Sequence, residues 1–208
     1  MLVVVSYYAA RPADLLRRLL TQLDARDPSA FDVAVVVNTT TGEPVALPPL
    51  RHEVPVLHRE NTGMNIGAWD HGWRSFPGYD RYVFLQDECV IMRPDWPDAY
   101  AALIDDPAVG LVGERIHPGH PWEEAEARSW RVTHYRRQLE GWGVPPGDSN
   151  RHVQSLIWAL RRDVLEAVDG FFIGRSGYDC IAAEIALSRQ VIARGLEIRL
   201  ARERRWFS

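Results

Sequence analysis

The sequence predicts a single α/β domain in which a mostly parallel central sheet is flanked by helices. Short runs of β-branched residues alternate with longer segments whose apolar residues recur at helical spacing, which is the pattern of strands joined by crossover helices. The chain has 208 residues, of which 46% are hydrophobic, and this is enough to bury one sizeable core. No internal repeat or clear change of composition marks a second domain.

The strands are predicted from short apolar runs of the kind that is buried on both faces of a sheet. They lie at residues 2–6, 33–37, 54–58, 82–85, 109–112 and 196–200, with a further apolar run at 156–160. The helices are predicted from apolar residues at helical spacing. They lie at 13–26, within 61–73, and at 98–105, 162–168 and 180–193.

Residues 116–150 differ from the rest of the chain. They hold HPGHPWEEAEARSW and EGWGVPPGD, which are rich in tryptophan, glycine and proline and carry little strand signal. Such a stretch predicts a binding loop or lid with a short helix.

Two adjacent carboxylates, Asp87 and Glu88, end the predicted strand at 82–85. Ligands of parallel α/β sheets bind at the carboxyl ends of strands, and carboxylates there suit Mg²⁺ or Mn²⁺, which would also bridge diphosphate oxygens. Neighbouring residues of a strand point to opposite faces, so one acid can face a cleft while the backbone or an arginine holds the other. The alternative is a pair of solvated acids that simply terminate the strand.

A third acid, Glu184, lies within the apolar segment IAAEIAL of a late helix. Burying a carboxylate is costly unless it is paired or functional, and a general base is one such function. The alternative is an acid on the exposed side of the helix, or one that pairs with Arg189.

Composition excludes several classes of function. The formal net charge of -4 gives no reason to expect a nucleic-acid partner. All 24 basic residues are arginine, which excludes a mechanism that needs a catalytic lysine. The chain has no GxGxxG after its first strand, no GxxxxGK[ST] and no GxSxG. The histidines at 117, 120, 134 and 152 lack the HExxH or cysteine pairs of a zinc site, although one of them could join a diphosphate-bound metal.

The compartment is expected to be cytoplasmic. The two cysteines, Cys89 and Cys180, have no CxxC spacing and are expected to be buried free thiols, which suits a reducing environment. No apolar stretch approaches the ~20 residues that cross a bilayer. The start, MLVVVSYYAARP, lacks the basic region and the full apolar region of a signal peptide.

Several segments, in order along nearly the whole chain, carry a resemblance to a known family. They are VVVSYYAARPADLLRRLL, VAVVVNTTTG, HRENTGMNIGAWDHGW, FLQDECVIMRPDW, IWALRRDVLEAVDGFF and IAAEIALSRQVIARGLEI. These segments resemble the family 2 glycosyltransferases, which have the Rossmann-like GT-A fold of the nucleotide-diphospho-sugar transferase superfamily. The resemblance implies a hexosyltransferase-like enzyme that transfers a sugar from a nucleotide-diphosphate sugar to an unknown acceptor, with inversion and with Mg²⁺ or Mn²⁺.

The resemblance also implies roles for individual residues. Glu88 matches the acid that holds the metal in the family, with Asp87 beside it, and Glu184 matches the catalytic base, with Asp179 as a second candidate. The positions that match the donor-binding segments are Ser6, Tyr7, Asn38, Asn61, Gly63, Gly72 and Asp70. Residues 1–115 would then form the nucleotide-sugar-binding half, and residues 116–208 the acceptor-side half with its tryptophan-rich loop.

Tryptophans 122, 130 and 142 of that loop would cover the donor or the acceptor, because aromatic faces stack on sugar rings. Ordinary core packing is the alternative for these side chains. Any further acceptor domain would come from a partner protein or a homo-oligomer.

Three positions depart from the family pattern: Val37, Gln86 and Ala183 stand where acids are usual. They favour an alternative, a non-catalytic GT-A-like module that binds a nucleotide or a sugar. A sugar nucleotidyltransferase on a related fold is a further alternative. However, SYYAARPAD lacks the glycine-rich basic loop that usually follows the first strand in those enzymes.

Overall fold

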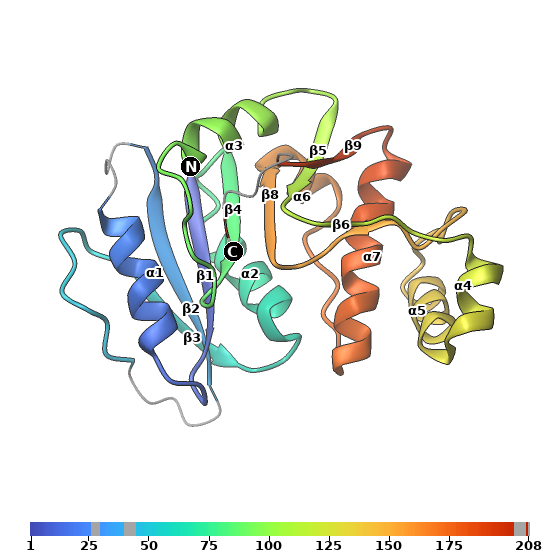
Figure 1. Ribbon diagram of the computed structural model, residues 1–208, viewed down its shortest axis with the longest axis horizontal. Coiled ribbons are helices and arrows are strands. Elements are labelled where there is room, and N and C mark those ends of the chain that lie inside the picture. The colour runs from blue at the N-terminus through green and yellow to red at the C-terminus, as the bar shows by residue number, and fades with distance from the viewer. Residues whose placement is uncertain (26–29, 40–44, 202–206, 208) are drawn as a thin grey trace.

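The computed structural model describes residues 1–25, 30–39, 45–201 and 207 (Figure 1). Its strands are β1 Leu2–Tyr8, β2 Asp32–Thr39, β3 Val56–Glu60, β4 Arg81–Gln86, β5 Val109–Gly113, β6 Ile116–His117, β7 His152–Val153, β8 Ile157–Arg161 and β9 Glu197–Leu200. Its helices are α1 Asp14–Asp24, α2 Met64–Ser75, α3 Trp96–Ile104, α4 Trp122–Arg128, α5 Trp130–Gly141, α6 Arg162–Ala167 and α7 Gly177–Ala193. Each predicted strand and helix is present, with ends that differ by a few residues. Arg26, the last residue of the predicted first helix, lies outside the described residues.

The main sheet has seven strands in the order β3-β2-β1-β4-β8-β5-β9. All neighbours pair in parallel except β8, which runs antiparallel to both β4 and β5. The predicted α/β class, with a mostly parallel sheet flanked by helices in a single domain, is therefore confirmed. The reversal of β8 places its amino end beside the carboxyl ends of β4 and β5, at the edge where ligands of such sheets bind.

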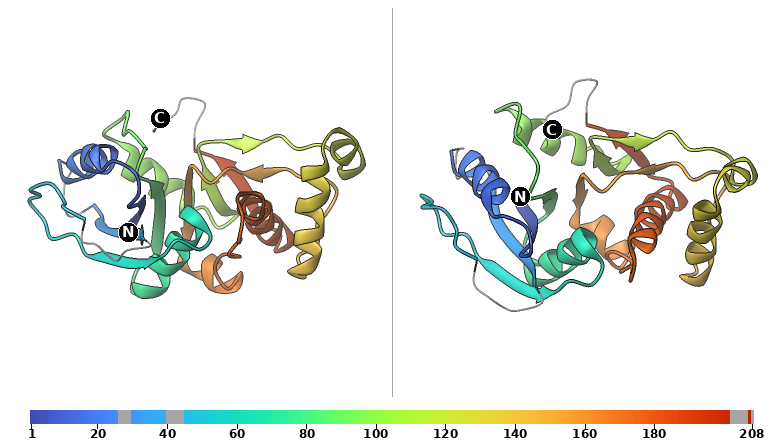
Figure 2. Two further views of the ribbon diagram at one scale, coloured as in Figure 1. Left: turned by 90° about the horizontal axis from the view of Figure 1, so that it is seen from below. Right: turned by 60° about the horizontal axis from the view of Figure 1, so that its bottom comes forward.

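Helices cover both faces of the sheet (Figure 2). One face buries Val3, Val5 and Val35 against α1 and α3, and the other buries Leu2, Val4 and Ala34 against α2, α6 and α7. Alternate residues of β1 therefore serve two cores, which is why its residues from Leu2 to Val5 are all apolar. Among the described residues, no helix is long and apolar enough to cross a membrane.

Residues 116–150 are more helical than the sequence predicts. In place of a loop with a short helix, α4 and α5 form two consecutive helices that lie outside α7, at one end of the molecule (Figure 1). Trp122, Tyr135 and Leu139 pack against Ala182 and Ile185 of α7 in a separate small core. The apolar stripe of α4 and α5 is narrow because it faces only α7. Many charged residues lie between its apolar residues, so their helical spacing is hard to recognise in the sequence.

Aromatic side chains fill the core beneath the ligand-binding edge. The rings of Trp69 and Trp158 lie 5.2 Å apart, and Phe171 lies 5.3 Å from both Trp158 and Phe84. Trp69 Nε1 donates to the carbonyl of Leu85, and Trp158 Nε1 donates to the carbonyl of Val153. The cluster therefore fixes both the end of β4 and the strand β7.

Both cysteines are free and buried, as predicted. Burial raises the pKa of the Cys89 thiol to about 12 and that of Cys180 to about 11. Neither thiol is a nucleophile at neutral pH.

Candidate active site

Two neighbouring pockets lie at the ligand-binding edge of the sheet. The first, named here the strand-end pocket, has a volume of about 300 Å³ and is lined by Ser6, Tyr7, Tyr8, Arg11, Asn38, Asn61, Met64, Asn65, Gln86 and Asp87. The second, named the α7 pocket, has a volume of about 460 Å³. It is lined by Gln86, His117, Val132, Tyr135, Asn150, His152, Gln154, Ser155, Leu156, Ile181, Glu184 and Ile185. Gln86 lines both pockets, so the two hollows meet at the end of β4.

Asp87 is the buried acid of the strand-end pocket. It is 5% exposed, and its Oδ2 atom has no hydrogen-bond partner among the described residues. Burial raises the pKa of the Asp87 carboxyl, while Arg11 opposes the rise and Glu88 adds to it. A buried carboxylate oxygen without a partner is costly unless a ligand supplies one.

Glu88 points elsewhere. Its side chain is 47% exposed, and Oε2 lies 3.5 Å from Nη1 of Arg11. Adjacent residues thus present one buried carboxylate to the pocket and one half-exposed carboxylate to an arginine. Arg11 itself lines the strand-end pocket, so one cation interacts with both acids.

Asn38 is held from two sides at the end of β2. Its amide nitrogen donates to the carbonyl of Met64 at 2.8 Å, and its amide oxygen accepts from Nη1 of Arg59 at 2.7 Å. Burial lowers the pKa of Arg59, against the opposing charges of Asp70 and Glu60. Sequence reasoning missed Arg59, because a single arginine in a short strand gives no local signal.

The remaining residues expected in the strand-end pocket lie at or beside it. Ser6 Oγ donates to the carbonyl of Leu85, and the Tyr7 hydroxyl donates to the carbonyl of Arg11. Asn61 lines the pocket directly. Gly63 caps α2 with φ of 75°, and a Cβ there would lie 2.6 Å from a methyl group of Ile173. Glycine at this position therefore lets α2 begin close to the pocket.

Glu184 lies in the α7 pocket rather than on an exposed stripe, and its side chain is 14% exposed. Its Oε1 atom accepts from Oγ of Ser155 at 2.5 Å, and its Oε2 atom lies 3.4 Å from Nε2 of His152. The alternative pairing with Arg189 is wrong, because Arg189 contacts Asp148 at 3.5 Å.

Ser155 connects Glu184 to the junction of the pockets. Its carbonyl accepts from Nε2 of Gln86 at 2.6 Å and from Nδ2 of Asn65 at 3.0 Å, while its hydroxyl donates to Glu184. Sequence reasoning did not select Ser155, Asn65 or His152 as site residues. Gln154 and Ser155 are polar residues next to a strand, like the polar residues that follow the parallel strands. They come before β8 in the sequence because β8 is reversed.

Asp179 lies outside both pockets. Its Oδ2 atom accepts from the amides of Arg175 and Ser176 in a capping box, and Oδ1 lies 2.8 Å from Nε2 of His134. Burial alone would raise the pKa of Asp179, but these hydrogen bonds, with that from His134 the largest, lower it. A carboxylate that begins a helix and has a lowered pKa is poorly suited to accept a proton.

Asp70 also lies outside both pockets. Its Oδ1 atom accepts from Nε1 of Trp73 at 3.0 Å and from the amide of Phe171 at 2.9 Å, and its Oδ2 atom accepts from Nε of Arg74 at 2.9 Å. The carboxylate joins α2 to the turn at Gly170, where it has a structural role in place of the nucleotide contact that the resemblance implies.

Replacing Asp70 with alanine is therefore expected to lower the free energy of unfolding by about 2–3 kcal/mol, because buried donors of Trp73 and Phe171 lose their acceptor. Urea denaturation measures the loss, and Asp70→Asn, which keeps an acceptor oxygen, should lose less. Weaker nucleotide binding by Asp70→Ala at unchanged stability would contradict this role.

The described residues contain no group of three or more histidine, cysteine or acidic side chains placed to hold a metal ion. The residues present still fit a shared cation, because Mg²⁺ in proteins is often held by one or two carboxylates together with substrate phosphates. The unpartnered Oδ2 of Asp87 provides one such ligand, and Glu88 lies next to it.

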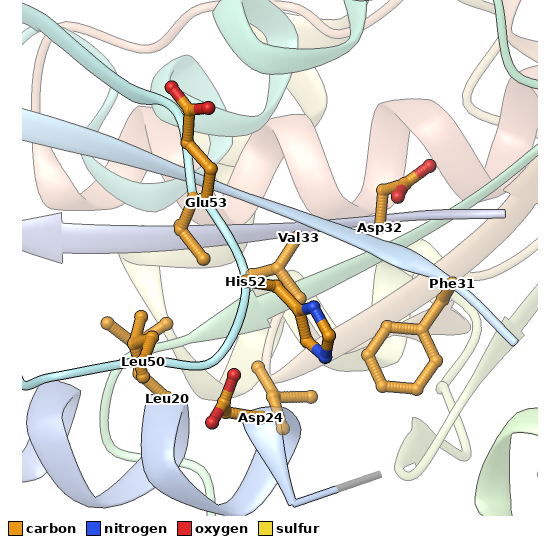
Figure 3. Close-up of a pocket in the computed structure, with 10 residues that line it drawn as sticks. Leu20, Asp24, Phe31, Asp32, Val33, Leu50, His52 and Glu53 are labelled. Atoms are coloured by element: carbon orange, nitrogen blue, oxygen red, sulfur yellow. The ribbon is translucent and has the colours of Figure 1, made fainter. Parts of the chain in front are cut away.

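Figure 3 shows a third pocket, of about 120 Å³, at the other edge of the sheet. Asp32 and Val33 at the start of β2 line it, together with Phe31, Leu20 and His52. Two of its three acids have partners: Asp24 accepts from Arg51, and Asp32 interacts with Tyr79. No residue predicted for catalysis or ligand binding lies there.

The fold is that of GT-A, Rossmann-like nucleotide-sugar transferases, as the resemblance implies. In sequence, the chain matches no protein-family model and no curated protein. In structure, it is similar to the mannosyltransferase PcManGT from Pyrobaculum calidifontis, solved with GDP-Man and Mn²⁺, with 18% identity and a TM-score of 0.62 over 96% of this chain and 53% of that one.

Two further solved structures are similar. TarS 1–349 of S. aureus has 14% identity and a TM-score of 0.60, over 99% of this chain and 59% of that one. CMP:2-keto-3-deoxy-manno-octonic acid synthetase with CTP has 16% identity and a TM-score of 0.52, over 96% of this chain and 88% of that one. The chain thus spans little more than half the length of the chains in the first two structures. At these identities the similarity establishes the fold.

Proposed function

We propose that this protein is a glycosyltransferase of the family 2 type, which transfers a sugar from a nucleotide-diphosphate sugar to an acceptor hydroxyl with inversion. The observation that carries the proposal is the pairing of the two pockets. A buried acid with an unpartnered oxygen, Asp87, lies in one, a second acid, Glu184, lies in the other, and Gln86 lines both. The fold shared with a mannosyltransferase and with TarS agrees with it.

The strand-end pocket is the proposed donor site. Tyr7, Asn38 and Asn61 line it and would contact the nucleoside, while Arg11, which also lines it, would pair with phosphate oxygens. Asp87, with Glu88, would hold Mg²⁺ or Mn²⁺. The bound cation would offset the negative charge of the diphosphate leaving group.

The α7 pocket is the proposed acceptor site. Glu184 would accept the proton of the acceptor hydroxyl as that oxygen attacks the anomeric carbon. Ser155 fixes the carboxylate through its hydroxyl, and the amide of Gln86 fixes Ser155 through its carbonyl. Because Gln86 lines both pockets, donor and base are held by one connected set of hydrogen bonds.

An exposed aromatic pair joins the start of α5 to the start of α7. Trp130 is 64% exposed and its ring centroid lies 5.2 Å from that of Tyr178, in the first turn of α7. Of the other tryptophans of this region, Trp122 is buried in the core and Trp142 stacks on Phe172. Trp130 is therefore the one of the three whose face is free to contact a sugar of the acceptor.

A sugar nucleotidyltransferase is the second candidate. One observation favours it: the chain covers 88% of the CTP-bound synthetase, against 53% and 59% of the two glycosyltransferases. A module that binds a nucleotide sugar without turnover is the third, and Val37, Gln86 and Ala183 in place of acids favour it.

Thermal shift with nucleoside diphosphates, CTP and nucleotide sugars, each with Mg²⁺ or Mn²⁺, tests the proposal, because a ligand of the native state raises the melting temperature. We expect a nucleoside diphosphate to stabilise the protein in the presence of metal, and the matching nucleotide sugar to be slowly hydrolysed. Pyrophosphate release from CTP and a free sugar would instead identify a nucleotidyltransferase. Binding without turnover of donor, with any acceptor tried, would identify a binding module.

The metal role is tested by a matched pair of neighbouring substitutions. Asp87→Asn is expected to weaken donor binding in Mn²⁺ by about 10- to 100-fold, because it removes the charge of the buried carboxylate. Glu88→Gln should weaken it by less than about fivefold, since Glu88 is half-exposed and paired with Arg11. Calorimetry with and without Mn²⁺ measures both. Equal donor affinity for Asp87→Asn and the unaltered protein would rule out Asp87 as a metal ligand.

A further inference from the structure

His152 is a buried side chain that the proposed mechanism leaves unused. It is 5% exposed, and its Nδ1 atom lies 2.7 Å from the carbonyl oxygen of Asn150. A carbonyl oxygen only accepts hydrogen bonds, so Nδ1 carries a hydrogen. In a ring with a single hydrogen, the other nitrogen, Nε2, is an acceptor with a free lone pair.

That lone pair faces the carboxylate of Glu184. Nε2 lies 3.4 Å from Oε2, while Oε1 is occupied by the hydroxyl of Ser155. A neutral ring and an ionised carboxylate present two acceptors to each other, and the distance is longer than a charge-assisted hydrogen bond. The pair can therefore take up one further proton between Oε2 and Nε2.

Other contacts hold this pair together. The hydroxyl of Ser188, which is fully buried, accepts from the amide of Val153 at 3.0 Å and donates to the carbonyl of Glu184 at 3.1 Å. A single side chain thus joins β7 to α7 beside His152 and Glu184. The distance between the two residues is set by buried hydrogen bonds rather than by a loop.

His117 covers the outer side of the His152 ring. The two residues are partners in the β6-β7 ribbon, and their rings stack with centroids 5.1 Å apart and planes at 15°. Burial lowers the pKa of His117 from 6.5, so this ring is neutral at pH 7. The stack limits access of water to the pair without adding a positive charge.

We propose that His152 is the positioning residue of the base: its Nε2 faces Oε2 of Glu184 and receives a hydrogen bond from the proton that Glu184 takes from the acceptor. This inference rests on the proposed function. It names no new substrate and deepens the role of the α7 pocket.

Atoms and charge are conserved in this step. A bond forms between the acceptor oxygen and the anomeric carbon, and the bond from that carbon to the diphosphate oxygen breaks, with its electrons leaving on the diphosphate. The hydroxyl proton moves to Oε2 of Glu184 and is shared with Nε2 of His152, so the pair changes from a charge of −1 to neutral. The hydrogen bond between them forms only as the proton arrives, which stabilises the transition state more than the ground state.

The chain offers a matched control on the same helix. His134 and Asp179 form a second histidine-carboxylate pair, with Nε2 and Oδ1 2.8 Å apart. Asp179 caps α7 and does not line the α7 pocket. Substitution of His134 therefore removes a similar pair without touching the site.

The first test uses nitrogen-15 NMR of the histidine rings in the intact protein at pH 7 and needs no substrate. The spectrum of His152, identified by its loss in His152→Asn, should show the neutral ring with hydrogen on Nδ1. The Nε2 signal should shift in Glu184→Gln while the Nδ1 signal stays. A ring with hydrogen on Nε2, or a doubly protonated ring, would overturn the inference. The NMR result does not depend on turnover of a nucleotide sugar. Failure of this inference can therefore be distinguished from failure of the proposed function.

The second test is kinetic. His152→Asn is expected to lower kcat by about 10- to 100-fold at unchanged donor affinity, and His152→Gln, which places an amide near Nε2, should restore part of it. His134→Asn should leave kcat unchanged. In the Glu184→Gln background, His152→Asn should have no further effect, because His152 acts through Glu184. A loss of kcat of equal size in both backgrounds, or an unaltered kcat in His152→Asn, would overturn the inference.

Discussion

Replacement of Glu184 with glutamine is expected to reduce sugar transfer by about 10²- to 10⁴-fold, which is the usual contribution of a general base. The substitution keeps the size of the side chain and leaves an amide oxygen to accept from the hydroxyl of Ser155. The amide cannot take up the acceptor proton. Donor binding takes place in the strand-end pocket, which Glu184 does not line, and should persist.

Steady-state transfer rates and calorimetric donor affinity measure the two expectations separately. Asp179→Asn is the control, because that carboxylate caps α7 outside both pockets, and its effect should be on stability. Full turnover by Glu184→Gln would remove Glu184 as the base. A comparable loss of turnover in Asp179→Asn, with the fold intact, would move the role to Asp179.

Truncation of Trp158 to alanine is expected to lower the free energy of unfolding by about 3–5 kcal/mol, the range for removing a large buried aromatic side chain. Trp158 is fully buried in β8, and its ring lies between those of Trp69 and Phe171. The change also removes the hydrogen bond from Nε1 to the carbonyl of Val153.

Urea unfolding monitored by circular dichroism measures the loss. Trp158→Phe keeps most of the apolar volume and should lose much less, while still removing the hydrogen bond to Val153. Val153 follows His152 in β7. If kcat falls in both variants, the cause is therefore the lost hydrogen bond to β7, which both lack, rather than the cavity that only Trp158→Ala creates. Equal unfolding midpoints for Trp158→Ala and the unaltered protein would contradict the packing described for this cluster.

The fold could be predicted from the sequence because its strands are buried on both faces. Residues 2–5 and 33–37 are uninterrupted apolar runs, and the structure extends the predicted strands 2–6 and 33–37 by no more than two residues at either end. The helices α4 and α5 could not be predicted in the same way. Their apolar residues contact one helix, α7, so tertiary contacts rather than a strong local period decide them.

The site could be predicted only in part. Asp87 and Glu184 stand out locally, one at a strand end and one in an apolar helix, and the structure places both in pockets that share Gln86. Ser155 and His152 could not be found from local pattern, because their importance depends on contacts with residues 29 or more positions away along the chain. Asp70 was selected by resemblance, and its hydrogen bonds to Phe171 and Arg74 show why resemblance at one position can mislead.

Because strand β8 is reversed, it brings a different set of residues to the site than the parallel strands do. Strands that point toward the ligand deliver the residues that follow them, whereas β8 delivers the residues that come before it. Gln154 and Ser155 therefore enter the site from the connection between α5 and β8, which also supplies Asn150 and His152 to the α7 pocket. Substitutions in this connection are therefore expected to change the acceptor side while the pairing of the main sheet is kept.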